Sequence, residues 1–216
     1  TKVVLITTGS LYVIGALLYW LSERNTPAFA ELDFGHQVLN YLMLSVTVRS
    51  SGFTNIGFTH LSFSSLILTN ILIFIGASSG STGGGIKVST LAVIVITIVR
   101  FFQGRKPTIF NRTLSNDTVK RAFFVFTIAV FLVAIGTFTL SITETLPDGI
   151  GSEYIFMEVV SALGSVGISM GLTPHLTVPG KFIIIILMLI GRVGVLTFLW
   201  SIIGDKRESR INYPEV

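Results

Sequence analysis

Long apolar stretches alternate with short polar interruptions along this chain of 216 residues. Val3–Leu21 and Ala122–Ile142 are apolar throughout most of their length, and Phe182–Ile203 is apolar apart from one arginine. Each stretch has close to the roughly 20 residues that a helix needs to cross the hydrocarbon core of a bilayer. The pattern therefore predicts three membrane-spanning helices, together with a fourth region that is interrupted.

The fourth apolar region is divided by a run of small residues. Leu66–Ala77 and Ile86–Phe102 are largely apolar, but Ser78–Gly85 between them consists entirely of Ser, Thr and Gly. A continuous helix over Phe63–Phe102 would be roughly 60 Å long at 1.5 Å per residue. The hydrocarbon core is only about 30 Å thick. We therefore expect the helix to break at Ser78–Gly85, which we call the small-residue loop.

Two shorter segments lie between the long ones, and each leads into a loop that contains glycine. Gln37–Arg49 and Glu153–Gly164 are too short to span a bilayer and have the length of pore helices or re-entrant segments. The loops that follow share the form Ser-x-Gly-apolar-Ser/Thr at an offset of 115 residues. The first glycine loop is Ser50-Ser51-Gly52-Phe53-Thr54, and the second is Ser165-Val166-Gly167-Ile168-Ser169.

The order span, short helix, glycine loop and span occurs twice in the same orientation. The sequence therefore predicts an all-α integral membrane fold of two membrane–pore-helix–membrane repeats, with four spans of which the second is broken. The predicted division is a repeat over 1–106, a cytoplasmic linker over 107–121, a repeat over 122–205 and a cytoplasmic tail over 206–216. Irregular backbone at membrane depth is tolerated where it lines a wet path, so both glycine loops are candidates to line a pore.

Charged residues make up only 12% of the chain, against about 25% in an average soluble domain, and they gather at the ends of the spans. Basic residues dominate 100–121 and the tail, which the positive-inside rule places in the cytoplasm. The short helices then enter from the outside. Acids that would modestly concentrate cations at that side follow the first span of each repeat, namely Glu31, Asp33, Glu144, Asp148 and Glu153.

Composition argues against several other kinds of site. The chain has no cysteine and only three scattered histidines, so no metal cluster is predicted, and no cofactor is expected. The small-residue loop resembles a phosphate-binding loop only superficially, because Ile86 separates Gly85 from Lys87 and no α/β domain surrounds it. The net charge of +4 is explained by membrane topology, so no nucleic-acid partner is predicted.

Gly52 and Gly167 are the leading candidates for contact with a cation. Carbonyl oxygens that replace a hydration shell must point to one axis, which requires backbone angles that glycine tolerates and other residues resist. The alternative is that each glycine merely ends a short helix in a left-handed cap. Because two loops cannot encircle an ion, a filter built from them needs two more.

Three basic residues within or next to the apolar segments have open interpretations. Arg192 lies in the middle of the last span, where a charge normally faces a cavity or a partner. It either pairs with a carboxylate such as Glu158 or projects into the pore as a positive barrier. Lys87 is either a second such charge or an anchor near the cytoplasmic face. Arg49 closes the first short helix, where a cation suits the helix dipole. The small-residue loop itself is either a passive kink or a movable constriction.

Four stretches together resemble the Trk/Ktr/HKT superfamily of potassium transporters, and in particular its bacterial Ktr and Trk membrane subunits. These stretches are Thr47–Phe53, Gly80–Lys87, Ser161–Pro174 and Gly191–Gly194. The resemblance covers nearly the whole chain. It implies a potassium-channel-like fold of four repeats in one chain, of which this sequence matches the third and fourth.

The resemblance also implies roles for individual residues and partners. Gly52 and Gly167 would be filter glycines in contact with potassium, the transported ion. The intramembrane gate, with Arg192 opposing it, would comprise Ser78, Ser79, Gly80, Ser81, Thr82, Gly83, Gly84, Gly85 and Lys87. Such subunits are homodimers in the bacterial cytoplasmic membrane, seated on a cytoplasmic ring of nucleotide-binding regulatory subunits. The N-terminal half of the same pore would come from a longer chain or from a second half-size chain.

The leading hypothesis is passive, gated potassium uptake through a filter of backbone carbonyls, with no enzymatic step. One alternative is a secondary transporter that binds a small substrate at a broken helix, although such transporters usually contain inverted repeats. Another alternative is an assembly partner that transports nothing itself. The relative orientation of the two repeats and the effect of the two glycines on ion flux distinguish these hypotheses.

Overall fold

The computed structural model describes residues 2–26, 29, 32–49, 51–54, 56–78, 81, 83–109, 112–146 and 149–194. Ser50, Ser79, Gly80, Thr82, the tail and the second half of the last predicted span lie outside this part. The helices are α1 (Lys2–Glu23), α3 (Phe34–Thr47), α4 (Phe63–Phe74), α5 (Val88–Phe102), α6 (Asn116–Thr143), α7 (Ser152–Gly164) and α8 (Val178–Val193). Two 3₁₀ turns occupy Phe58–His60 and Thr173–His175, and β1 (Thr108–Ile109) pairs antiparallel with β2 (Arg112–Thr113).

The prediction of a helical protein is confirmed, and two helices, α1 and α6, are long and apolar enough to cross a membrane by length and composition. α6 begins earlier than the apolar run that starts at Ala122. Ser115 caps it, because its hydroxyl oxygen accepts a hydrogen bond from the Thr118 N–H at 3.2 Å, and Asp117 lies in the first turn. Capping chemistry thus extends the helix into residues that the hydropathy pattern assigned to the linker.

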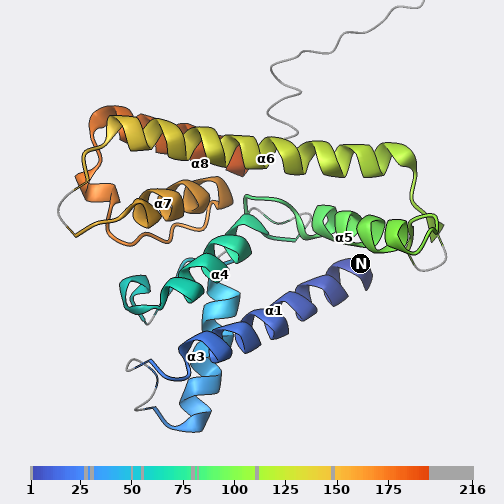
Figure 1. The fold of residues 1–216 in the computed structure, drawn as a ribbon, viewed down its shortest axis with the longest axis horizontal. Helices are drawn as coiled ribbons and strands as arrows, with labels where there is room; N and C mark the ends of the chain where they lie inside the picture. The colour runs from blue at the N-terminus through green and yellow to red at the C-terminus, as the bar shows by residue number, and fades with distance from the viewer. Residues whose placement is uncertain are drawn as a thin grey trace, which may run out of the picture.

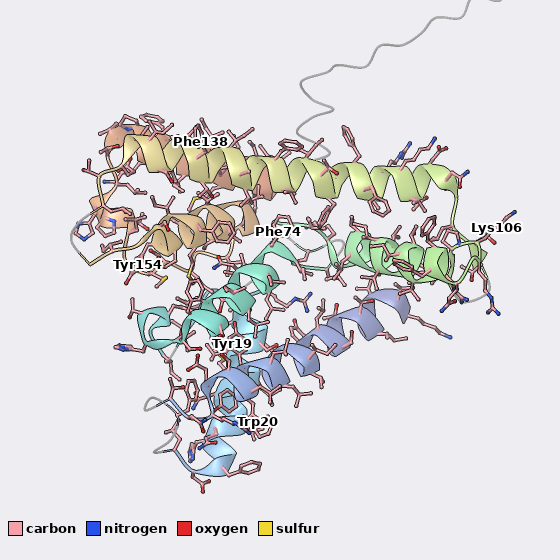
Figure 2. The ribbon with its side chains drawn as sticks, in the orientation of Figure 1. Tyr19, Trp20, Phe74, Lys106, Phe138 and Tyr154 are labelled. Carbon is pink, nitrogen blue, oxygen red and sulfur yellow. The ribbon has the colours of Figure 1, made fainter. Side chains whose placement is uncertain are left out.

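The segment between α4 and α5 is a structured connection. α4 ends at Phe74, whose ring packs edge to face on Phe126 of α6 with centroids 6.0 Å apart (Figures 1 and 2). The Ile86 N–H donates to the Phe74 carbonyl at 3.0 Å, and the Val88 N–H donates to the Ala77 carbonyl at 3.3 Å. These bonds hold the end of one helix beside the start of the next.

α7 lies beneath α6 and α8 and contacts both of them as well as α4 (Figure 1). Its residues from Met157 to Gly164 are all buried. The approach of α8 is close enough to require glycine, since a Cβ atom at Gly191 would overlap the Leu163 carbonyl oxygen. Small residues that let helix backbones approach in this way are typical of packing between membrane helices.

The two long helices turn large apolar side chains outward. Phe138 on α6 points away from the other helices and is 67% exposed (Figure 2). The inner side of α1 carries Tyr19, which is fully buried and hydrogen-bonds to the hydroxyl of Thr69 on α4 at 2.7 Å. An apolar outer face with polar contacts turned inward is the reverse of a soluble helix and suits a lipid environment.

Two buried glutamates cap later helices in matching ways. Glu23 ends α1 and accepts hydrogen bonds from the N–H and hydroxyl of Ser62, the N-cap of α4, at 2.8 and 2.6 Å. Glu144 follows α6 and accepts the same two bonds, at 2.8 and 2.6 Å, from Thr177, the N-cap of α8. A carboxylate there opposes the positive end of the helix dipole and satisfies free donors. Glu144, one of the acids predicted for the outer turns, is thus 8% exposed and hydrogen-bonded to the start of α8.

We expect Glu144→Ala to destabilise the folded protein by about 2–3 kcal/mol, because it removes two charge-assisted hydrogen bonds and leaves the Thr177 N–H without its partner. Thermal unfolding of the purified protein in detergent measures this loss. Asp117→Ala is the control, since Asp117 is an exposed acid in the first turn of α6 and should contribute less than about 1 kcal/mol. Equal losses for the two variants would contradict a capping role for Glu144.

Candidate functional site

The two glycine loops meet at their backbones. Gly52 has a φ of +69° and Gly167 a φ of +85°, both in the left-handed region that favours glycine. A Cβ atom at Gly52 would overlap the carbonyl oxygen of Val166 and would lie 3.4 Å from the Val166 carbonyl carbon. Gly52 therefore has no room for a side chain. Two segments separated by 115 residues are in direct contact at the predicted positions.

The second glycine loop is anchored by its apolar side chains. Val166 and Ile168 are buried, whereas Gly167 and Ser169 between and after them are exposed. A Cβ atom at Gly167 would meet no atom within 4 Å. The loop therefore holds its two apolar side chains in the core and presents its glycine to open space.

Neither glycine is the cap of the helix before it. The left-handed residue that ends α7 is Ser165, with a φ of +52°, and the residue that ends α3 is Val48, which has a right-handed helical conformation. The interpretation of Gly52 and Gly167 as simple C-caps is therefore wrong. The glycines are needed later in each loop, where the chain has already left the helix.

The first glycine loop is fixed by the last residue of α3. The N–H groups of Ser51 and Gly52 both donate to the Thr47 carbonyl, at 3.1 and 3.2 Å, and the Thr47 hydroxyl donates to the Phe53 carbonyl. The Phe53 carbonyl is thus used in an internal bond. Beyond it, Thr54 receives a hydrogen bond from the Ile56 N–H on its hydroxyl oxygen at 3.1 Å.

The small-residue loop docks on the C-terminal end of α7. The Gly84 N–H donates to the Gly164 carbonyl at 3.1 Å, and the Gly85 N–H donates to the Leu163 carbonyl at 3.0 Å. The last four carbonyls of a helix have no partner within it. Those of α7 are all satisfied, two by this loop and two by the N–H groups of Ser165 and Val166. The loop thereby completes the end of the helix that leads into the second glycine loop.

Two basic residues donate hydrogen bonds to backbone carbonyls in the small-residue loop and just before it. The Lys87 ammonium donates to the carbonyls of Ser81 and Gly83 at 3.1 and 2.5 Å, so it bonds to the loop's own backbone. Arg49 is 2% exposed, donates to the Gly76 carbonyl at 3.3 Å and lies 4.8 Å from the centre of the Tyr12 ring. Arg49 therefore links α1 to Gly76, just before the loop, a role that its place at the end of α3 did not reveal.

Arg192 and Glu158 do not form a pair. The Glu158 carboxylate accepts hydrogen bonds from the hydroxyls of Ser169 and Thr173 instead. Arg192 is exposed near the end of α8. The pairing interpretation is wrong, and the interpretation of Arg192 as a positive barrier beside the loop stays a prediction.

Sequence reasoning missed the helix caps and the docking contacts. Ser62 and Thr177 are 115 positions apart, which is the offset of the glycine loops, so a search for matched N-cap residues would have found them. Glu23 and Glu144 differ by 121 positions and escape that comparison. The bonds from Gly84 to α7 leave no trace in the local pattern beyond the richness of the loop in glycine.

Comparison with protein families and curated proteins gives a consistent result. The family model described as TrkH, cation transport protein, matches residues 1–206. The chain is similar to the potassium/sodium uptake protein NtpJ of Enterococcus hirae, with 40% identity over 218 residues that cover 100% of this chain and 48% of the relative. It is also similar to the Ktr system potassium uptake protein B of Bacillus subtilis, with 37% identity over 217 residues, 100% of this chain and 48% of the relative.

The chain spans about half the length of the curated relatives that it matches. A further relative, the Ktr system potassium uptake protein B of Vibrio alginolyticus, shows 35% identity over 217 residues, which cover 100% of this chain and 47% of the relative. The matched family and these relatives are transport proteins and not enzymes. The predicted resemblance is therefore confirmed over almost the whole chain.

Proposed function

This chain belongs to the TrkH family of cation transport proteins and is a membrane protein, and from that premise we propose that it forms half of a potassium uptake pathway. The backbone carbonyls of Ser50–Thr54 and Ser165–Ser169 replace water around the ion. Two further loops, from the other half of the pore, complete the ring. The setting is the bacterial cytoplasmic membrane, which the chain crosses several times.

The backbone contact between the two glycine loops carries this proposal. Loops that share one ion must lie close together, and Gly52 touches the peptide group of Val166, 114 positions later in the chain. Passive helix caps on separate pore helices would need no such contact. The exposed, uncrowded Gly167 adds a second feature that suits a surface facing an ion.

In the same proposal the small-residue loop is the gate. Two peptide hydrogen bonds join it to the end of α7, and the Lys87 ammonium donates a hydrogen bond to the Gly83 carbonyl within it. Arg192 lies near the end of α8, which packs on α7, and its charge adds a positive barrier to cations. The homodimer and the cytoplasmic ring of nucleotide-binding subunits enter the proposal from the family resemblance alone.

A secondary transporter with a substrate at the broken helix is the less favoured alternative. Its usual repeats have opposite orientations across the membrane. In the proposed arrangement each unit crosses the membrane twice and returns to its starting side, so the second unit keeps the orientation of the first. The matching caps at Ser62 and Thr177 support two units of the same internal fold.

The proposed function predicts that Gly167→Ser in the complete protein lowers the potassium-over-sodium permeability ratio about tenfold. A side chain at a φ of +85° costs about 1–2 kcal/mol, which displaces the loop backbone, and 1.4 kcal/mol corresponds to a factor of ten. The protein should fold, because the site is open. Reconstituted vesicles with an imposed ion gradient give the ratio.

Gly149→Ser is the matched control, since Gly149 has a φ of +88° and equally open surroundings but lies before α7, outside the filter. It should leave the permeability ratio unchanged. A folded Gly167→Ser protein with an unaltered ratio would remove Gly167 from the filter. A drop of the same size in both variants would attribute the effect to general backbone strain.

A further inference from the structure

A buried carboxylate accepts a hydrogen bond from the last residue of the second glycine loop. Glu158 belongs to α7, is 6% exposed and is flanked in the helix by buried Met157 and Val159. The residue 115 positions earlier, Met43 on α3, is 41% exposed and carries no charge. The carboxylate is therefore a feature of the second loop that the first loop does not share.

Both oxygens of this carboxylate bind the chain that leaves the loop. Ser169 donates its hydroxyl to Oε2 at 2.9 Å, and Thr173 donates its hydroxyl to Oε1. The Gly171 N–H donates in turn to the Ser169 hydroxyl oxygen at 3.0 Å. One buried group thus ties Ser169, the last residue of the loop, to the turn that follows.

The carboxylate accepts one hydroxyl hydrogen bond on each of its two oxygens. Hydrogen bonds to a charged acceptor are shorter and stronger than neutral ones. The Glu158 charge therefore fixes Ser169 firmly, while Val166 and Ile168 anchor the preceding residues in the core.

We infer that Glu158 is a positioning residue that sets the cation selectivity of the second glycine loop. It acts through Ser169, by holding the peptide groups at Gly167 and Ile168 at the separation that suits one ion size. A loose loop would close around a smaller ion as readily as around a larger one. This inference rests on the proposed function of the loop as a filter.

The test is the potassium-over-sodium permeability ratio of the complete protein in reconstituted vesicles. Glu158→Gln keeps the shape but removes the charge and one acceptor, and we expect the ratio to fall about tenfold, equivalent to about 1.4 kcal/mol. Ser169→Ala should lower the ratio by a similar factor. The double variant should be no worse than either single variant, because both changes break the same link.

Three further variants make the result decisive. Glu144→Gln removes a buried carboxylate that caps α8, away from the loop, and should leave the ratio unchanged. Glu158→Asp retains the charge and should keep part of the selectivity. If Glu158→Gln does not fold, Ser169→Ala and Thr173→Val leave the carboxylate in place and decide the matter.

An unchanged ratio in folded Glu158→Gln, or in both hydroxyl variants, would overturn the inference. Multiplicative effects in the double variant would also overturn it, because they would show independent roles. The Gly167→Ser variant distinguishes a failure of the inference about Glu158 from a failure of the filter hypothesis. If Gly167→Ser changes the ratio and Glu158→Gln does not, only the role of Glu158 is lost, whereas no change in either removes the filter.

Discussion

Gly52→Ala is expected to reduce potassium uptake by about 100-fold or more in the complete protein. A Cβ atom at a φ of +69° costs about 1–2 kcal/mol, and its overlap with the Val166 carbonyl oxygen forces a backbone shift that costs about 1–3 kcal/mol more. The strain falls on the contact between the two glycine loops. Rates of potassium uptake, normalised to the amount of protein in the membrane, measure the effect.

Two glycines provide controls that separate crowding from conformation. Gly104 has a φ of +64° and open surroundings in the link between the two units, so Gly104→Ala has the same conformational cost and should leave uptake nearly unchanged. Gly167→Ala has the conformational cost within the filter but no overlap, so its effect should be intermediate. If uptake by folded Gly52→Ala equals that by Gly104→Ala, the contact at Gly52 has no part in conduction.

The positions of most helix ends could be predicted from local sequence patterns. Thr47 and Gly164 end the two short helices within two residues of the predicted positions, because the chemistry of helix ends is local. The break after Phe74 occurs next to a run of Ser, Thr and Gly that disfavours helix. The start of α6 was misplaced because hydropathy does not register the cap at Ser115.

The connections among these elements could not be predicted in the same way. Glu158 was compared with Arg192 because opposite charges suggest a pair, yet the fold brings two hydroxyls to the carboxylate instead. Arg49 bonds to Gly76 across 27 positions, and no periodicity encodes that distance. Such contacts depend on how whole helices pack, which a single sequence specifies only through the complete fold.

Gly84→Ala is expected to raise ion flux about tenfold while it leaves the potassium-over-sodium ratio intact. A Cβ atom at Gly84 would lie 2.6 Å from the Leu163 carbonyl oxygen and 2.7 Å from the Ser165 hydroxyl oxygen, so the docked loop must move away. Undocking breaks two peptide hydrogen bonds, worth roughly 1–3 kcal/mol together. That is enough to shift a closed-to-open equilibrium by a factor of about ten. Flux into vesicles measures the rise.

The permeability ratio distinguishes a gate from a mere support of the filter. The loop satisfies the last two carbonyls of α7, just before the second glycine loop begins, so its loss could instead disorder that loop. Raised flux with an unchanged permeability ratio identifies the small-residue loop as a gate. Raised flux with a lost permeability ratio identifies it as a structural support of the second glycine loop. Gly104→Ala, a change at an open glycine in the link between the units, should alter neither quantity. Arg192→Ala should raise flux as well, because it removes the positive barrier without touching α7, and unchanged flux in both folded variants would exclude a gate here.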